Sequence, residues 1–165
     1  MNTQTRISNV VNTTCSTFAS LEDGYGGLRQ PPREIPHAAA GYRKRMSRTL
    51  VIKLTAGAEE AERANQAFTV AASAVAAGAT VSLWLTGEAV WFAVPGRAES
   101  FELPYAAPLT DLLTAVLEGG QLTVCTQCAK RRNLTEADVL PGTRIAGAPT
   151  FTEEILTENT QAIVY

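Results

Sequence analysis

The chain has 165 residues, 45% of them hydrophobic and 18% charged, so it is long enough to bury a core and too apolar to be a disordered protein. Its net charge of −2 hides an asymmetry, because residues 1–49 carry 7 Lys and Arg against 3 Asp and Glu, whereas residues 50–165 carry 7 against 13. The acidic balance of the larger part argues against nucleic-acid binding.

The first 48 residues are rich in Asn, Thr, Ser, Gly and Pro and show no sustained apolar period. Such composition is typical of a flexible extension, here a basic one. It contains Cys15 and His37, the only histidine of the chain. We therefore predict two parts, a flexible basic extension over residues 1–48 and a folded domain over residues 49–165.

From Leu50 onward, predicted strands and helices alternate. The apolar run 50–54 is typical of a strand buried on both faces, and Glu-rich residues then open a helix that Gly78 ends. Further strands are predicted at 80–85, 121–125, 143–146 and 162–165, and further helices at 88–94, 108–119, 126–133 and 150–159, the last opened by a capping box of Thr150 and Glu153. Five strands joined by helices indicate an α/β protein, a three-layer α/β/α domain with a five-stranded, mostly parallel sheet.

One uncharged stretch, residues 64–87, is long enough to span a bilayer. Its first half is mostly Ala with Ser and Thr, and Gly78 interrupts it, so a packed helix followed by a buried strand fits better. No secretory signal opens the chain, and three cysteines are too few for a disulfide scaffold. We expect a cytoplasmic protein without a membrane segment.

The cysteine pair Cys125 and Cys128 is the main candidate for chemistry. The third predicted strand ends at Cys125, where a helix would begin. Free N–H groups and the positive end of the dipole in that first helical turn favour the thiolate, which is the nucleophilic form. The same C-x-x-C spacing also occurs in redox couples, in zinc half-sites and among buried cysteines.

Other chemistries are poorly supported by the sequence. One C-x-x-C with a remote Cys and a remote His argues against a metal site, and the lack of a histidine in the domain argues against a Cys–His hydrolase. The turn with Thr55 and Gly57 could hold an anion but lacks a nucleotide fingerprint, so we expect no cofactor. Thr126 and Arg131 are further candidate contacts for an anionic substrate, although a cation at a helix end more often points to solvent.

The tryptophans near the predicted strand ends allow two interpretations. Trp84 and Trp91, with Phe92, could line a pocket, but such residues more often belong to the core or to an oligomer contact.

The order of elements and the segment Val124-Cys-Thr-Gln-Cys-Ala-Lys-Arg-Arg-Asn-Leu134 resemble the DsrE/DsrF-like family, which includes the TusD-type sulfur-relay subunits. The resemblance covers about residues 50–165. It implies a flavodoxin-like strand order 2-1-3-4-5, homo-oligomers such as trimers or hexamers, and sulfane sulfur carried as a persulfide on Cys125, exchanged with donor and acceptor proteins. Cys128 is found in some members only, and a second thiol shifts the expected chemistry toward redox cycling.

Three hypotheses follow. The first is a sulfur-relay or persulfide-handling protein in which Cys125 is the nucleophile and Cys128 assists or releases the sulfur; this hypothesis includes a weak sulfurtransferase activity. The second is a thiol-disulfide redox protein that cycles a Cys125–Cys128 disulfide. The third is a non-catalytic oligomeric scaffold in which both cysteines are merely packed.

Overall fold

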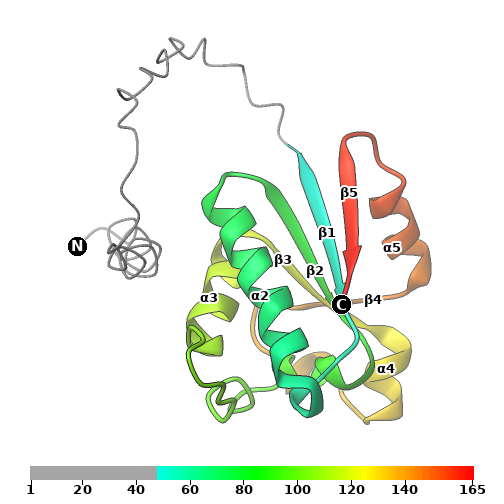
Figure 1. The fold of residues 1–165 in the computed structure, drawn as a ribbon. Helices are drawn as coiled ribbons and strands as arrows, with labels where there is room; N and C mark the ends of the chain where they lie inside the picture. Colours follow the sequence, from blue (N-terminus) through cyan, green and yellow to red (C-terminus); the bar gives the residue numbers. More distant parts are fainter. Residues whose placement is uncertain (1–47) are drawn as a thin grey trace, which may run out of the picture. The chain divides into compact units, whose positions relative to one another are not determined.

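The computed structural model describes residues 48–165 (Figure 1). The predicted extension, with Cys15 and His37, therefore lies outside the described residues except for Arg48. The elements run in the order β1 (Thr49–Leu54), η1 (Ala58–Glu60), α2 (Ala61–Ala76), β2 (Thr80–Leu85), η2 (Gly87–Ala93), α3 (Leu109–Gly119), β3 (Gln121–Cys125), α4 (Thr126–Arg131), η3 (Glu136–Asp138), β4 (Arg144–Ala146), α5 (Ala148–Ile155) and β5 (Thr160–Val164).

The five strands form one sheet in the order β4-β3-β2-β1-β5, and every neighbouring pair is parallel. The predicted α/β class, with a five-stranded parallel sheet, is confirmed. The predicted strand order 2-1-3-4-5 is wrong, because β2 and not β1 lies next to β3.

The positions of the crossover helices explain the observed order. Helices α2 and α3 lie side by side and pack on the same face of the sheet, α2 against β1 and β2 and α3 against β2 and β3 (Figure 1). Right-handed crossovers on one face all step in the same direction, so β1, β2 and β3 become consecutive neighbours. The order 2-1-3-4-5 would need these two helices on opposite faces. The chain returns past β1 to β5 through α5, whose side chains contact the other face.

The hydrophobic core lies between the sheet and the α2–α3 pair. Alternate residues of the strands point to this side, and α2 presents small residues with one large ring, which lets the helix approach the sheet closely. The fully or almost fully buried members include Ile52, Leu54, Val81, Leu83, Leu85, Leu122 and Val124 from the strands and Ala64, Ala67, Phe68, Ala71, Leu109 and Val116 from the helices.

The opposite face of the sheet is much more polar. One row of paired positions across four strands reads Lys53, Trp84, Thr123 and Arg144. The short helix α5 contacts this row, and no residue of α5 is buried. The strand 49–54 is therefore amphipathic in part, with a lysine on its second face.

Several element boundaries differ from the prediction. Helix α5 begins at Ala148, with Gly147 as N-cap and Pro149 in the first turn, so the predicted capping box at Thr150 is wrong. Pro at the start of a helix costs nothing because its missing N–H would be unpaired there. Strand β5 begins at Thr160, two residues earlier than predicted.

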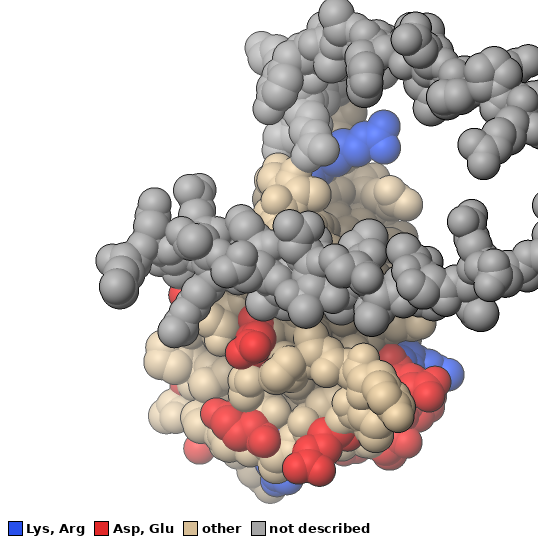
Figure 2. Space-filling view, turned by 60° about the vertical axis from the view of Figure 1, so that its left-hand side comes forward, with Lys and Arg blue, Asp and Glu red and all other residues tan. Residues whose placement is uncertain are grey.

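No helix among residues 48–165 has the length and apolar character that crossing a membrane requires. On the face that Figure 2 presents, acidic side chains outnumber basic ones, in line with the composition of residues 50–165.

Candidate functional site

Cys125 is the last residue of β3 and the N-cap of α4. Its side chain is half-buried and lines a cavity of about 310 Å³ at the carboxyl end of the sheet. This is where parallel α/β sheets place their functional groups, because the loops after the strands converge there. A thiol in such a position is accessible to a small molecule while most of it remains shielded from water.

The pKa of Cys125 lies below the ordinary range of a thiol. Burial is the largest single influence and raises the pKa, but the backbone N–H and thiol of Cys128, the backbone N–H of Gln127 and the charge of Lys53 together outweigh it. Each of these groups stabilises the thiolate. The predicted activation by the opening helix turn is thus present, with Lys53 as an additional cause that the sequence did not suggest.

Cys128 lies one turn further along α4 and is buried, with 8% of its surface exposed. Its Sγ accepts a hydrogen bond of 3.2 Å from the backbone N–H of Gly87. Gly87 has a φ of 58°, and a Cβ there would lie 2.7 Å from the carbonyl oxygen of Thr55. Glycine at this position therefore allows the turn after β2 to approach both the thiol and the end of β1.

The helix α4 is fixed at its other end by Arg132. The guanidinium donates to the carbonyl of Cys128 at 3.1 Å and pairs with Glu88 at 2.5 Å, and Trp91 donates to the same carboxylate at 3.1 Å. The Arg132 side chain is only 16% exposed. The cations after Cys128 were expected to point to solvent, which fits the exposed Arg131 but not Arg132.

A carboxylate from α5 organises the polar face of the sheet. Glu154 accepts hydrogen bonds from Ser82 at 2.7 Å and from the indole of Trp84 at 2.8 Å, and it forms an ion pair with Arg144. Burial is the largest influence and raises the pKa of Glu154, but these three donors together hold it below its usual range. The carboxylate is therefore ionised at neutral pH and holds α5 against the strands.

The predicted substrate contacts fall into two groups. Thr126 lines the Cys125 cavity. Thr55 and Gly57 do not line it, because the Thr55 hydroxyl donates to the carbonyl of Tyr165 at 2.7 Å and the N–H of Gly57 to the side chain of Glu59 at 2.8 Å. Arg131 is exposed at the end of α4 and is not among the lining residues.

Most residues that line the cavity were not predicted as site residues, and the three with large or charged side chains are Lys53, Trp84 and Phe151. They come from β1, β2 and α5, so only the tertiary fold brings them to the thiol. The alternation of Lys53 within an apolar strand was the one available signal. Trp84 lines the pocket, whereas Phe92 is in the core and Trp91 binds Glu88.

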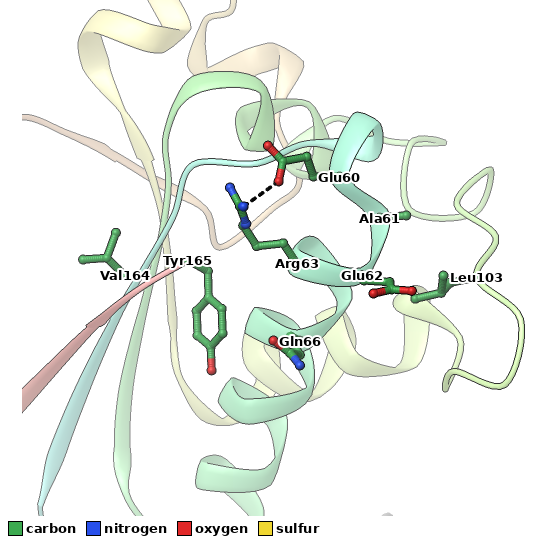
Figure 3. Close-up of a pocket in the computed structure, with 8 residues that line it drawn as sticks. All are labelled: Glu60, Ala61, Glu62, Arg63, Gln66, Leu103, Val164 and Tyr165. Carbon is green, nitrogen blue, oxygen red and sulfur yellow. Dashed lines mark ion pairs between the residues drawn. The ribbon is translucent and has the colours of Figure 1, made fainter.

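A larger hollow of about 910 Å³ lies at the ends of β1 and β5, where the strand order reverses (Figure 3). Its lining includes Leu103, Tyr165 and the first turns of α2, but no cysteine. Its one arginine, Arg63, is paired with Glu60 at 2.8 Å, as the dashed line in Figure 3 shows. We place the candidate site at Cys125, because the larger hollow contains neither a strong nucleophile nor a free cation.

Within residues 48–165, no three His, Cys, Asp or Glu side chains converge as ligands for a metal ion. The cavity is lined by the thiol of Cys125, by Lys53 and by polar, small and aromatic side chains.

Comparisons with known proteins agree with this fold. The YchN protein of E. coli matches with a TM-score of 0.61 at 13% identity, covering 72% of this chain and 99% of that one. A protein of unknown function from Methanobacterium thermoautotrophicum, MTH1491, matches with a TM-score of 0.55 at 10% identity and the same coverage. No curated protein matches the sequence. The model of the DsrE/DsrF-like family matches residues 49–161, as the resemblance predicted, and the chain therefore belongs to this family.

Proposed function

We propose that this protein handles sulfane sulfur and carries it as a persulfide on Cys125. The observation that supports this best is the combination of a half-buried thiol, a lowered pKa and an adjacent cavity at the carboxyl end of the sheet. A thiolate is required because the thiol attacks sulfur poorly. Membership of a family associated with sulfur relay supports the same function.

The proposed cycle involves no net oxidation. The Cys125 thiolate attacks the outer sulfur of a donor persulfide, the donor S–S bond breaks, and the donor leaves as a thiolate with the electron pair. Cys125 is then a persulfide, whose terminal sulfur is attacked in turn by an acceptor thiolate. Cys125 returns as the leaving thiolate, ready for another cycle.

Intact-protein mass spectrometry after incubation with a small-molecule persulfide tests this function. The Cys15→Ser background removes the third thiol of the chain from the measurement. We expect the mass of one added sulfur atom in this background and in Cys128→Ser, and none in Cys125→Ser. Addition that persists without Cys125 would refute the assignment of the carrier residue.

A second candidate function is thiol-disulfide redox cycling between Cys125 and Cys128. The position of Cys128 favours it, because this residue lies one helical turn beyond Cys125 and its thiol is one of the groups that lower the pKa of Cys125. In this reaction a disulfide or peroxide takes two electrons, and the two thiols lose their protons and form one S–S bond. Mild oxidation should then lower the mass by two hydrogens only when both cysteines are present.

The two functions and the scaffold hypothesis give different results in the same pair of assays. Sulfur addition without disulfide formation indicates the relay, and disulfide formation without sulfur addition indicates the redox protein. If Cys125 reacts with neither reagent faster than a free thiol does, the scaffold hypothesis remains.

Partners follow from the same proposal. We expect a protein donor and a protein acceptor of sulfur, and we expect this chain to form a homo-oligomer, as the resemblance implies. Two large apolar side chains at the ends of α5 and β5, Leu156 and Val164, are 77% and 64% exposed and are available for such contacts.

A further inference from the structure

The charge of the Cys125 cavity is set by one residue. Of the side chains that line it, only Lys53 carries a formal charge when the thiol is protonated; the others are polar, small or aromatic. Lys53 is the second-last residue of β1 and is half-buried, on the same face of the sheet as the thiol of Cys125. Once Cys125 is ionised, the two opposite charges share one small space.

The ammonium of Lys53 is positioned by an aromatic ring rather than by a carboxylate. Its Nζ lies 5.0 Å from the centroid of the Phe151 ring, and that ring packs edge-to-face on Trp84 at 5.3 Å. Lys53 belongs to none of the ion pairs found in residues 48–165. A cation held over a ring keeps most of its charge available to a ligand.

The neighbouring charged groups do not compete for this position. Glu154 and Arg144, which also lie on this face of the sheet, pair with each other, and Arg144 also donates to Thr123. Lys130 on α4 is exposed and does not line the cavity. The net result is a small pocket with one available positive charge beside a nucleophilic sulfur.

We propose that the Cys125 pocket accepts negatively charged sulfane-sulfur donors and that Lys53 is the residue that selects them. This inference deepens the proposed function and takes its class of substrate, a sulfane-sulfur donor, from it. The physical reason is that a thiolate and an anionic donor repel each other, so their encounter needs a compensating cation. A cavity of about 310 Å³ suits a small donor.

Thiosulfate illustrates the reaction. The Cys125 thiolate attacks the sulfane sulfur, the S–S bond of thiosulfate breaks, and sulfite leaves with the electron pair. Cys125 becomes a persulfide anion, and the total charge is unchanged. The ammonium of Lys53 faces negative charge before and after the transfer, on the donor and then on the persulfide and the departing sulfite.

The experiment compares two alkylating agents of the same chemistry, anionic iodoacetate and neutral iodoacetamide. The ratio of their rates at Cys125 cancels the fraction of thiolate, so it reports the local potential whether or not the protein carries persulfide. In the Cys15→Ser background, peptide mass spectrometry assigns the rate to Cys125. The variants are Lys53→Met, Lys53→Arg, which keeps the charge, and Lys130→Met, which removes a charge elsewhere.

We expect Lys53→Met to lower the iodoacetate-to-iodoacetamide ratio about 3- to 10-fold, as removal of one unit charge in a half-exposed site should do. Lys53→Arg keeps the charge, and Lys130→Met removes an exposed charge that salt screens, so both should leave the ratio within about 2-fold of that of the parent. Raising the salt from about 0.05 M to about 0.5 M should lower the ratio of the unsubstituted protein and change that of Lys53→Met little. An equal ratio in Lys53→Met and the parent, or an equal fall in Lys130→Met, would overturn the inference.

A second measurement separates this inference from the proposed function. Mass spectrometry after incubation with thiosulfate should show slower sulfur addition in Lys53→Met than in the parent. If a small-molecule persulfide adds no sulfur to Cys125 while the alkylation ratio still depends on Lys53, the proposed function fails and the selection of anions stands. If sulfur from thiosulfate adds at equal rates with and without Lys53, the selection of donors by charge is refuted.

Discussion

Substitution of Glu154 tests how α5 is held on the sheet. None of the eight residues of α5 is buried, so apolar burial cannot hold this helix by itself. Glu154 instead accepts from Ser82 and Trp84 and pairs with Arg144. We predict that Glu154→Ala destabilises the protein far more than its position on a short, exposed helix would indicate.

The magnitude follows from the partners that are lost. Hydrogen bonds to a charged acceptor contribute about 1.5–3 kcal/mol each, and Trp84, which is 2% exposed, would keep a buried N–H without an acceptor. The side chain of Arg144 is 37% exposed, so its ion pair adds no more than about 1 kcal/mol. We expect Glu154→Ala to cost about 3–5 kcal/mol and Glu154→Gln, which keeps an accepting oxygen, about 1–2 kcal/mol.

Denaturant unfolding measures these values, with Glu153→Ala as the matched control. Glu153 is the preceding residue of the same helix and is exposed, and only its backbone carbonyl accepts a bond, from Thr157. Its substitution should change the free energy of unfolding by less than about 0.5 kcal/mol. If Glu154→Ala costs no more than Glu153→Ala, the network does not hold α5.

The pH dependence gives an independent check. The pKa of Glu154 is lowered in the folded protein, since its donors outweigh the opposing effect of burial. The carboxylate therefore contributes stability that is complete above the unfolded pKa of about 4.3 and is lost as the pH falls through the lower, folded value. The difference between the parent and Glu154→Gln should shrink below about pH 4, and a constant difference would contradict this account.

Three further predictions concern the site and the assembly. The rate at which iodoacetamide alkylates Cys125 should reach half its maximum at a pH below the ordinary thiol pKa of about 8.5. Cys128→Ala should raise this midpoint pH more than Cys128→Ser, because serine retains a hydroxyl donor. An unchanged midpoint in Cys128→Ala would rule out the Cys128 side chain as a cause of the lowered pKa. Gly87→Ala should cost about 2–4 kcal/mol in denaturant unfolding, against about 1 kcal/mol for Gly142→Ala, which shares a positive φ but has open space around it; equal costs would mean that the close approach at the first position is unimportant. Light scattering should show an oligomer that Leu156→Glu dissociates, and an unchanged mass would remove that side chain from the interface.

Local sequence patterns predicted the elements of this fold well and their arrangement less well. The strand 121–125 and the helix that follows it were readable from an apolar run and a short polar stretch. The strand order was not, because it depends on which face each crossover helix covers, and both faces of a parallel sheet can be apolar. The start of α5 was missed because two helix-start signals compete within four residues, Pro149 and Thr150 with Glu153, and the earlier one is used.

For the candidate site too, the local features could be predicted from the sequence, and the arrangement of distant residues could not. The candidate cysteine and its helix turn are local features, so the sequence alone predicted the direction in which the pKa of Cys125 is shifted; its role as the sulfur carrier stays a prediction. The cavity wall is built from β1, β2 and α5, whose lining residues Lys53, Trp84 and Phe151 are about 30 to 100 residues apart along the chain. Lys53 therefore became a candidate site residue only once the strand register showed that it lies on the same face as the thiol. Thr55 and Gly57 do not line the cavity, because they are hydrogen-bonded to Tyr165 and Glu59 instead.

The interactions around α4 also give this protein a built-in optical reporter. Cys128 is linked to Arg132 through its carbonyl, Arg132 to Glu88, and Glu88 to the indole N–H of Trp91. Indole fluorescence is sensitive to the charges and hydrogen bonds around the ring, so a displacement of α4 should change the emission of Trp91. Reactions at the cysteine pair that move this short helix can then be followed in real time without a label, in a Trp84→Phe variant that leaves Trp91 as the single tryptophan.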